Sequence, residues 1–316
     1  MSQRSKVSII GAGAVGTATA YALLIKRIAG EVALYDVNKA RVEAEVLDLA
    51  HGSQFTNPSR VYGGDDLEVV RNSDIVVITA GAKQKPGQTR LDLAGVNVEI
   101  LRDLMPKLVH LAPDAIYILV TNPCDVLAYA AVRFSGLPAT RVFASGTVLD
   151  SSRLRWQLAE RLGVSTESVH ALIVGEHGDS EFPLWSEVKI GPIALSEWNV
   201  GGRAPLEQHE LDQIAYDVKN AAYKVIEGKG ATNYAIGLSA ARIVEAVLRD
   251  EGVILPVSSV LHDYLGISDV ALSVPTLVNR QGAAQVIPMK ITEAENDKLQ
   301  ASAKALRESI VKLGLA

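Results

Sequence analysis

Cysteine is almost missing from the sequence, since Cys124 stands alone among 316 residues. A single cysteine forms no disulfide within its own chain, and it provides too few thiolates for a zinc site built on cysteines. Stable disulfides are typical of oxidising compartments, so their exclusion favours a reducing, cytoplasmic location. The six histidines include no pair at a convincing metal-ligand spacing, and we therefore expect no metal centre.

Long hydrophobic runs are missing as well. The longest apolar runs, residues 75–78 and 115–120 among them, have the length of a strand. A membrane-spanning helix needs about 18 consecutive apolar residues, so we expect no membrane span. The apolar stretch near the N-terminus is short and contains three glycines, which argues against a signal peptide.

The chain has no excess of positive charge. It contains 31 Lys and Arg residues against 36 Asp and Glu residues, which gives a formal net charge of −5. Proteins that bind nucleic acid or anionic membranes present basic surfaces, so we expect neither as a partner. Hydrophobic residues make up 48% of the chain, which is enough for a large core and excludes a disordered or fibrous protein.

In the first half of the chain, short apolar runs rich in Val and Ile alternate with longer helical patterns. Strands are predicted at residues 7–10, 32–35, 75–78, 116–120 and 142–144. Helices are predicted between them at residues 15–26, 40–50, 91–110 and 126–134. Strands that alternate with helices form crossover units, so the fold class is α/β, with a Rossmann-type doubly wound parallel sheet.

The second half has a different pattern, with no repeat and no low-complexity linker before it. The expected elements are a helix at 147–162, a strand at 170–175, helices at 206–227 and 232–249, β-rich segments at 253–260 and 270–278, and a helix at 292–313. The last helix begins with a capping box from Thr292 to Glu295. We expect a nucleotide-binding domain at residues 1–145 and an α+β substrate domain at residues 146–316.

The sequence GAGAVG at residues 11–16 matches the glycine pattern of dinucleotide-binding turns. A predicted strand precedes it, a helix follows, and Asp36 ends the next strand. Glycines allow the backbone to approach a pyrophosphate, whose charge sits at the helix N-terminus. The Asp36 carboxylate can accept a hydrogen bond from a ribose 2′-hydroxyl and repels a 2′-phosphate, so the pattern favours NAD over NADP.

Ligands of a doubly wound sheet bind at the carboxyl ends of its strands, where polar residues follow several predicted strands. Thr79 and Asn122 follow two of them, and His177 follows another in a glycine-flanked loop. Histidine is the usual proton shuttle near neutral pH. Taken alone, however, a loop histidine is more often simply solvated.

Three further features allow alternative interpretations. The basic loop at residues 82–90 is either a lid that carries a cation or a solvated loop. Asp150 shares a helix face with Arg153, but it could equally be the acid of a capping box that starts at Thr147. Arg155 lies roughly 200° around the helix from Arg153, so these two arginines cannot serve the same pocket.

Taken together, the motifs resemble those of the lactate and malate dehydrogenase family over nearly the whole chain. They are GAGAVG at residues 11–16, ITAGA at 78–82, GQTRLDL at 87–93, TNP at 121–123, LDSSR at 149–153 and GEHGDS at 175–180. Several independent motifs in one order are far more specific than any one of them. The resemblance implies reversible hydride transfer between NADH and a small 2-keto acid.

The resemblance also implies a role for each matching residue. His177 is the expected acid/base, Asp150 orients and stabilises its charged form, and Arg90 polarises the substrate carbonyl as the loop closes. The expected substrate contacts are Gln84, Arg90, Asn122, Arg153 and Thr232, with Arg153 as the carboxylate anchor. The expected cofactor contacts are Gly11, Gly13, Val15, Gly16, Asp36, Thr79, Gly81, Val120, Asn122 and Ile236.

Substrate choice within the family depends on Gln84. Malate-specific members carry an arginine at this place, which neutralises the second carboxylate of oxaloacetate. A neutral glutamine leaves that charge uncompensated and favours pyruvate and L-lactate. The flanking Lys83 and Lys85 keep malate dehydrogenase as an alternative, and a non-catalytic NAD-binding structural protein is a second.

The resemblance implies a homotetramer of the bacterial type, because the long N-terminal arm of animal members is missing. Arg155 and His170 match the positions at which fructose bisphosphate binds between subunits of bacterial members. Such residues also occur in members without this regulation, so fructose bisphosphate is expected only as a possible effector.

Overall fold

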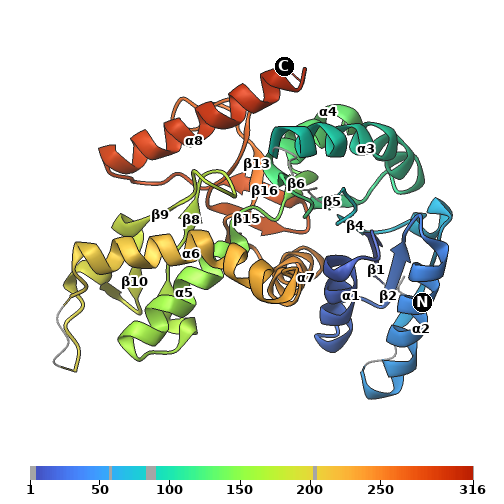
Figure 1. Ribbon diagram of the computed structural model, residues 1–316, viewed down its shortest axis with the longest axis horizontal. Coiled ribbons are helices and arrows are strands. Elements are labelled where there is room, and N and C mark those ends of the chain that lie inside the picture. Colours follow the sequence, from blue (N-terminus) through green and yellow to red (C-terminus); the bar gives the residue numbers. More distant parts are fainter. Residues whose placement is uncertain (1–4, 57–58, 83–89, 202–204, 316) are drawn as a thin grey trace.

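An eight-stranded sheet organises the chain in the computed structural model, which describes residues 5–56, 59–82, 90–201 and 205–315 (Figure 1). Its strand order is β14-β13-β6-β5-β4-β1-β2-β3. The six parallel strands are β1 (Lys6–Ile10), β2 (Glu31–Tyr35), β3 (Arg60–Gly64), β4 (Ile75–Ile78), β5 (Ile116–Leu119) and β6 (Val142–Ala144). Their order, 3-2-1-4-5-6, is that of a doubly wound Rossmann sheet, so the predicted fold class is confirmed.

Both faces of this sheet are buried, because successive side chains of a strand point to opposite faces. On β4, Ile75 and Val77 pack in a core with α1 (Ala14–Ile25) and α7 (Tyr234–Leu248). Val76 and Ile78 pack in a second core on the other face. This second core contains residues of α3 (Arg90–Leu111), α4 (Cys124–Ser135) and α8 (Glu293–Lys312). The uninterrupted apolar runs of the sequence therefore correspond to strands covered on both sides.

The second half of the chain adds two strands to the same sheet. β13 (Ser258–Val260) pairs antiparallel with β6, and β14 (Ala271–Ser273) pairs antiparallel with β13. A third core lies among α5 (Val148–Leu162), α6 (Gln208–Lys229) and short strands. The boundary between residues 145 and 146 therefore separates two segments that share a sheet, and it stays a prediction.

The remaining strands form small antiparallel sheets. They are β7 (Val169–His170), β8 (Ile173–Val174), β9 (Phe182–Pro183), β10 (Lys189–Ile190), β11 (Ile193–Ala194), β12 (Val253–Leu255), β15 (Thr276–Asn279) and β16 (Gly282–Val286). Helix α2 (Lys39–His51) packs beside β3. Single-turn 3₁₀ helices lie at Gly52–Phe55, Leu67–Val70, Thr166–Ser168, Trp185–Glu187 and Leu195–Glu197.

Two predicted β segments are wrong in detail. The strand expected at residues 170–175 is split, because β7 pairs with β10 whereas β8 pairs with β9. Residues 253–260 form β12 and β13, which belong to different sheets on either side of Pro256. β3 and β16 were not predicted, because both are rich in glycine and alanine and carry little strand signal.

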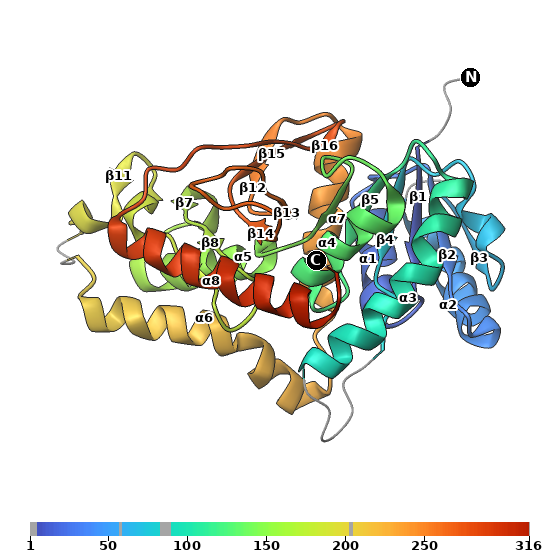
Figure 2. The ribbon, with the colours of Figure 1, turned by 90° about the horizontal axis from the view of Figure 1, so that it is seen from above.

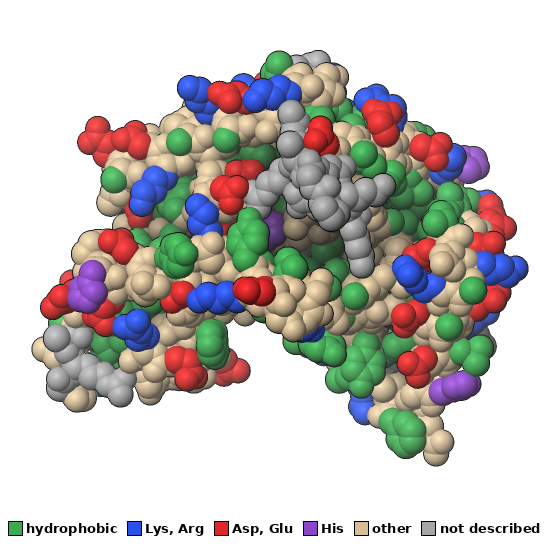
Figure 3. Space-filling model, in the orientation of Figure 1, with side chains coloured by type: hydrophobic (Ala, Val, Ile, Leu, Met, Phe, Trp, Pro, Cys, Tyr) green, Lys and Arg blue, Asp and Glu red, His purple; other side chains and the backbone are tan. Residues whose placement is uncertain are grey.

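Helix α8 crosses the second half and ends beside α4 (Figure 2). Its capping box is formed as predicted, since Thr292 accepts the Glu295 amide and Glu295 accepts the Thr292 amide. Figure 3 shows a hollow on one side of the molecule, where hydrophobic side chains gather over α1 and the end of α2. No helix in the described part of the chain combines the length and hydrophobicity that crossing a membrane requires.

Candidate active site

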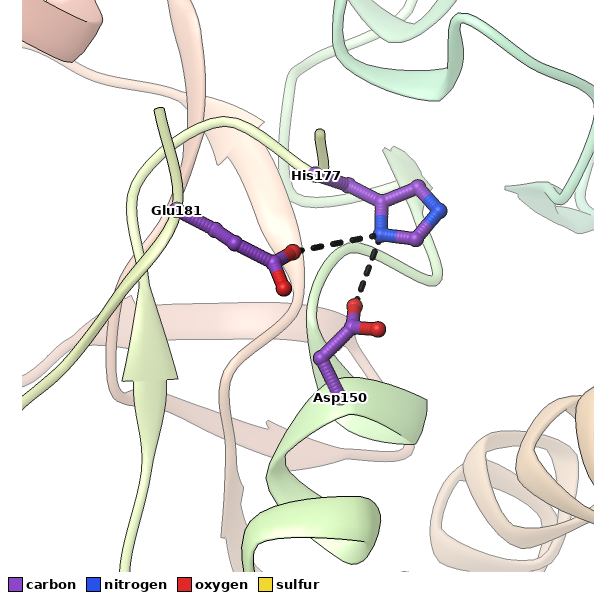
Figure 4. Close-up of side chains that lie close together, drawn as sticks. All are labelled: Asp150, His177 and Glu181. Atoms are coloured by element: carbon purple, nitrogen blue, oxygen red, sulfur yellow. Dashed lines mark hydrogen bonds and ion pairs between the residues drawn. The ribbon is translucent and has the colours of Figure 1, made fainter. Parts of the chain in front are cut away.

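Two segments from the second half bring an acid and a histidine together. Asp150 lies in the first turn of α5, and His177 lies in the loop between β8 and β9. Asp150 Oδ2 is 2.7 Å from His177 Nδ1, and the second ring nitrogen points away from the carboxylate (Figure 4). The Asp150 side chain is 1% exposed and that of His177 is 24% exposed. The imidazole is therefore fixed on one edge and accessible on the other.

The charges of this pair favour a protonated histidine. Burial alone would lower the pKa of His177, but the charge and hydrogen bond of Asp150 outweigh it and raise that pKa to about 9. Burial opposes ionisation of Asp150, yet the cationic His177 and Arg153 hold its pKa below its ordinary value. The pair is thus an imidazolium beside a carboxylate at neutral pH, an arrangement that can donate a proton.

Arg153 binds the other oxygen of the same carboxylate. Its Nη1 donates to Asp150 Oδ1 at 2.5 Å, one turn along α5. Thr147 does not cap this helix through its side chain, because its hydroxyl donates to the Ile173 carbonyl at 2.6 Å instead. The interpretation of Asp150 as the acid of a capping box is therefore wrong. Asp150 instead aligns a guanidinium and an imidazole side by side.

Asp125 holds the backbone of the histidine loop, a contact that the sequence analysis missed. Its Oδ2 accepts the His177 backbone N–H at 2.8 Å from the first turn of α4. Burial raises the pKa of Asp125 to about 6, although hydrogen bonds and the charge of His177 oppose this. The position of Asp125, directly after the TNPC sequence, is the one signal that could have identified it.

The loop is also supported from α8. The buried Ser302 hydroxyl accepts the Glu176 amide at 2.8 Å and lies 2.9 Å from the Ser180 hydroxyl. Ser180 in turn donates to Glu176 at 2.5 Å. Residues on both sides of His177 are therefore held by packed helices, which limits the movement of its ring.

The glycine turn is formed as predicted between β1 and α1. Gly11 has a φ of +104°, and a Cβ on Gly16 would lie 1.9 Å from the Gly11 carbonyl oxygen. A Cβ on Gly13 would meet no atom within 4 Å. The first and third glycines are thus required by the fold, whereas the second leaves open space at the N-terminus of α1, where a pyrophosphate fits.

Asp36 and Thr79 stabilise this turn from neighbouring strands. Asp36 Oδ2 accepts the Ala12 amide at 2.8 Å, and its Oδ1 accepts the Asn38 amide at 2.9 Å. The Thr79 hydroxyl lies 3.0 Å from the carbonyl oxygens of both Ile10 and Gly11. A carboxylate has acceptor capacity beyond these two bonds, so Asp36 can still accept a ribose hydroxyl.

Gly81 and Asn122 are brought together at the ends of β4 and β5. A Cβ on Gly81 would lie 2.3 Å from Thr121, so only glycine fits there. The buried Asn97 of α3 accepts the Ala82 amide and donates to the Asn122 carbonyl, both at 2.8 Å. Asn97 was not among the predicted site residues, because its contacts depend on how α3 packs against both loops.

An apolar cavity of about 750 Å³ lies beside the glycine turn. Its lining includes Tyr35, Val37, Ala80, Val96 and Ile100. A Rossmann sheet binds its dinucleotide at this edge, next to the reversal of strand order. The glycine turn, Asp36 and this cavity together fit NAD.

The other predicted cofactor and substrate residues are placed as follows. Val15, Val120 and Ile236 all pack in or against the core cluster between the sheet, α1 and α7. Thr232 lies half-buried just before α7. Arg90 begins α3, but its side chain lies outside the described part of the chain, and Gln84 lies outside the described residues altogether.

Arg155 and His170 line a separate cavity of 550 Å³, together with Glu187 and Lys290. Arg155 Nε donates to the Ala171 carbonyl at 2.9 Å, and burial lowers the Arg155 pKa. Arg153 faces Asp150 instead. The two arginines therefore lie at different sites: Arg153 lies beside His177, and Arg155 lies in this second cavity.

A third acid, Glu181, lies close to the pair. Its Oε2 is 3.8 Å from His177 Nδ1 (Figure 4). Ligating atoms of Asp150, His177 and Glu181 lie within 4.8 Å of one another, which is close enough to surround a metal. We assign no metal to them, because His177 Nδ1 is already engaged by the hydrogen bond to Asp150.

Comparison with known families covers almost the whole chain. Residues 5–144 match the model of the lactate/malate dehydrogenase NAD binding domain. Residues 147–314 match the model of the lactate/malate dehydrogenase alpha/beta C-terminal domain. The glycine turn and Asp36 fall in the first match, and Asp150, Arg153 and His177 fall in the second.

Individual relatives agree with these matches. The L-lactate dehydrogenase of Bifidobacterium animalis subsp. lactis is 51% identical over 311 residues, 98% of this chain and 97% of that protein. That of a Synechococcus species is 46% identical over 309 residues, 96% of this chain and 98% of that protein.

Solved structures give the same result. A lactate dehydrogenase from a Medee basin deep-sea metagenome library superposes with a TM-score of 0.94 at 35% identity, covering 99% of this chain and 100% of that one. The minor L-lactate dehydrogenase of Enterococcus mundtii, in its ligands-bound form, has a TM-score of 0.93 at 39% identity, with 98% of both chains covered. With both of its halves matched in order and its acid–histidine pair in the second, the chain belongs to the lactate/malate dehydrogenase family.

Proposed function

We propose that the chain is an NAD-dependent L-lactate dehydrogenase that interconverts pyruvate and L-lactate. The observation that carries the proposal is the Asp150 carboxylate, which binds His177 through one oxygen and Arg153 through the other. A proton donor and a carboxylate-binding fork thus lie side by side, as a 2-keto acid requires. We propose the cytoplasm as the location of this reaction, in keeping with the buried free thiol of Cys124.

Each side chain has one task in this mechanism. Arg153 binds the substrate carboxylate through its planar guanidinium. His177 gives its proton from Nε2 to the keto oxygen during reduction, and it takes that proton back during oxidation. Asp150 stabilises the charged imidazole, and bound NADH supplies the hydride. Arg90 is assigned to the carbonyl, which it polarises as the transition state develops.

The cofactor is assigned to the edge of the sheet where the glycine turn lies. Gly11, Gly13 and Gly16 are proposed to admit the pyrophosphate, and Asp36 to accept the adenine ribose. Further cofactor contacts are proposed for Val15, Thr79, Gly81, Val120, Asn122 and Ile236, with Asn122 and Ile236 beside the nicotinamide. Thr232 and Asn122 are proposed to contact the substrate as well.

The choice of pyruvate over oxaloacetate is assigned to Gln84. A neutral side chain at this position leaves the second carboxylate of oxaloacetate without a partner, which is costly in a closed pocket. The relatives named L-lactate dehydrogenase, at 51% and 46% identity, support this choice.

We also propose a homotetramer. A surface cavity of about 820 Å³ is lined by exposed apolar residues, which include Tyr21, Phe55, Tyr234 and Leu238. Phe55 is 84% exposed and Tyr234 is 72% exposed. Contiguous apolar surface of this kind marks a protein–protein contact, and a second copy of the chain is the proposed occupant.

Fructose bisphosphate is the proposed effector, at the cavity that holds Arg155 and His170. Lys290 contributes a further cation there, whereas Glu187 contributes an opposing charge. If two such cavities face each other across a symmetry axis, a bisphosphate would relieve the repulsion between their cations.

Steady-state kinetics test the proposed function. The wild type should have a kcat/KM for pyruvate at least about tenfold above that for oxaloacetate, since an unpaired buried charge is costly. Gln84→Arg should move the preference toward oxaloacetate, because it supplies the missing positive charge. A wild type that prefers oxaloacetate would make the chain a malate dehydrogenase instead.

A further inference from the structure

Glu181 is a buried acid that the mechanism described above does not use. Its side chain is 4% exposed, and its Oε2 lies 3.8 Å from His177 Nδ1, the ring nitrogen that Asp150 also binds (Figure 4). Two carboxyl groups therefore face one edge of the imidazole. Burial of an acid lowers the stability of the folded protein because it removes the hydration of the carboxyl group, so a buried acid without a role would be unfavourable.

The groups around Glu181 come from three elements. Asp150 and Arg153 face it from α5, and His177 lies in its own loop. Asp125 of α4 completes the acidic surroundings of the histidine, and the charge of Glu176 acts on Asp125. Burial, followed by the charge of Asp150, raises the pKa of Glu181 to about 8, while His177, Arg153 and the Gly178 amide oppose this.

The protonation state of Glu181 therefore changes close to the working pH. As a neutral acid it adds no negative charge where Arg153 is to receive the substrate carboxylate. As a carboxylate in more alkaline solution it stands beside the imidazolium and stabilises it. The proton that leaves Glu181 passes to solvent, so the total charge of the site falls by one while His177 stays protonated.

We propose that Glu181 is a positioning residue, a second acidic partner of His177 that keeps the imidazole protonated in alkaline solution and thereby extends ketone reduction to higher pH. This inference rests on the proposed function for its kinetic consequence. Its structural content, an acid that controls the protonation of His177, holds for any substrate.

Glu181→Gln keeps the shape of the side chain and removes its charge. The alkaline limit of kcat/KM for pyruvate should move down by about one pH unit, because a nearby opposite charge is lost. Lactate oxidation needs the neutral imidazole, so its acidic limit should move down by the same amount. At pH 6, where Glu181 is neutral in the wild type, the two proteins should reduce pyruvate at similar rates.

A second readout does not depend on turnover. Diethyl pyrocarbonate acylates neutral imidazole, and peptide mass spectrometry reports the modification of His177 against pH. The midpoint of this reaction should fall by about one unit in Glu181→Gln. Glu160→Gln is the matched control, since it removes an exposed glutamate from the outer face of α5 and should leave the midpoint unchanged.

The results separate this inference from the proposed function. Superimposable His177 midpoints in wild type and Glu181→Gln would overturn the role of Glu181, even if pyruvate is the substrate. A shifted midpoint without any pyruvate turnover in the wild type would support the role of Glu181 and refute the proposed function. If Glu181→Gln does not fold, Glu181→Asp provides the test. Its shorter side chain moves the carboxylate away from His177, so the midpoint of His177 modification should shift in the same direction by a smaller amount. An unchanged midpoint would overturn the inference.

Discussion

The carboxylate of Asp125 accepts the backbone N–H of His177 at 2.8 Å, so α4 of the nucleotide-binding half holds the chain that carries the proposed acid/base. The ring of the same histidine is held by Asp150 of α5. Backbone and side chain are thus fixed by different helices. This double attachment determines where the proton is delivered, and positioning of this kind has large effects on rate.

Asp125 makes the stability of the protein depend on pH. Its pKa is raised to about 6 from 3.8, so the folded protein binds this proton more tightly than the unfolded chain. Stability therefore falls as the pH rises between these two values. Asp125→Asn removes the ionisation and keeps an oxygen for the His177 amide. We expect the Tm of the variant, measured relative to that of the wild type, to rise by a few degrees between pH 4 and pH 8. A Tm difference between the two proteins that is independent of pH would contradict this.

The glycine turn can be tested by a matched pair of variants. Gly16→Ala places a Cβ 1.9 Å from the Gly11 carbonyl oxygen, so it should lower both the Tm and the affinity for NADH. Gly13→Ala meets no atom within 4 Å and should keep the Tm of the wild type while it weakens NADH binding. Thermal unfolding and NADH fluorescence titration measure the two effects. Equal NADH affinity in wild type and Gly13→Ala would place the pyrophosphate elsewhere.

The effector proposal predicts a specific response to fructose bisphosphate. In the wild type near neutral pH, the sugar bisphosphate should lower the KM for pyruvate about fivefold or more, which is the usual range of allosteric coupling. Arg155→Gln should lose this response, because the cavity loses a cation, and should keep its basal kcat. Pyruvate saturation curves of both proteins, with and without the effector, provide the comparison. Identical curves for the wild type would refute the regulation and leave the dehydrogenase proposal intact.

Much of the fold could be predicted because its signals are local. The run IVVI of β4 is uniformly apolar and is bounded by polar residues, and the structure has the strand at the predicted residues. β3, with the sequence RVYGG, has no such signal and is held by its pairing with β2. Residues 170–175 read as one strand, yet their halves pair with different partners. The local sequence pattern contains no information on which distant strands pair with each other.

The candidate site divides in the same way. The glycine turn and Asp36 follow from spacing along the chain, whereas the ambiguity of Asp150 is resolved only by tertiary contacts. The hydroxyl of Thr147 donates to the Ile173 carbonyl and does not cap α5, and the Asp150 carboxylate binds His177. Glu181 could have been noticed, because it lies four residues after His177, but its burial depends on how the loop packs.

The most direct test of the account is the replacement of His177 by asparagine. The variant should lose about 10²- to 10⁴-fold in kcat for pyruvate reduction, since asparagine cannot give a proton to the keto oxygen. It should bind NADH with the affinity of the wild type, because the cofactor is assigned to the glycine turn and the neighbouring strand ends. Both values come from one preparation, by steady-state kinetics and fluorescence titration. A variant that binds NADH normally and reduces pyruvate at the rate of the wild type would contradict the assignment of His177 as the acid/base.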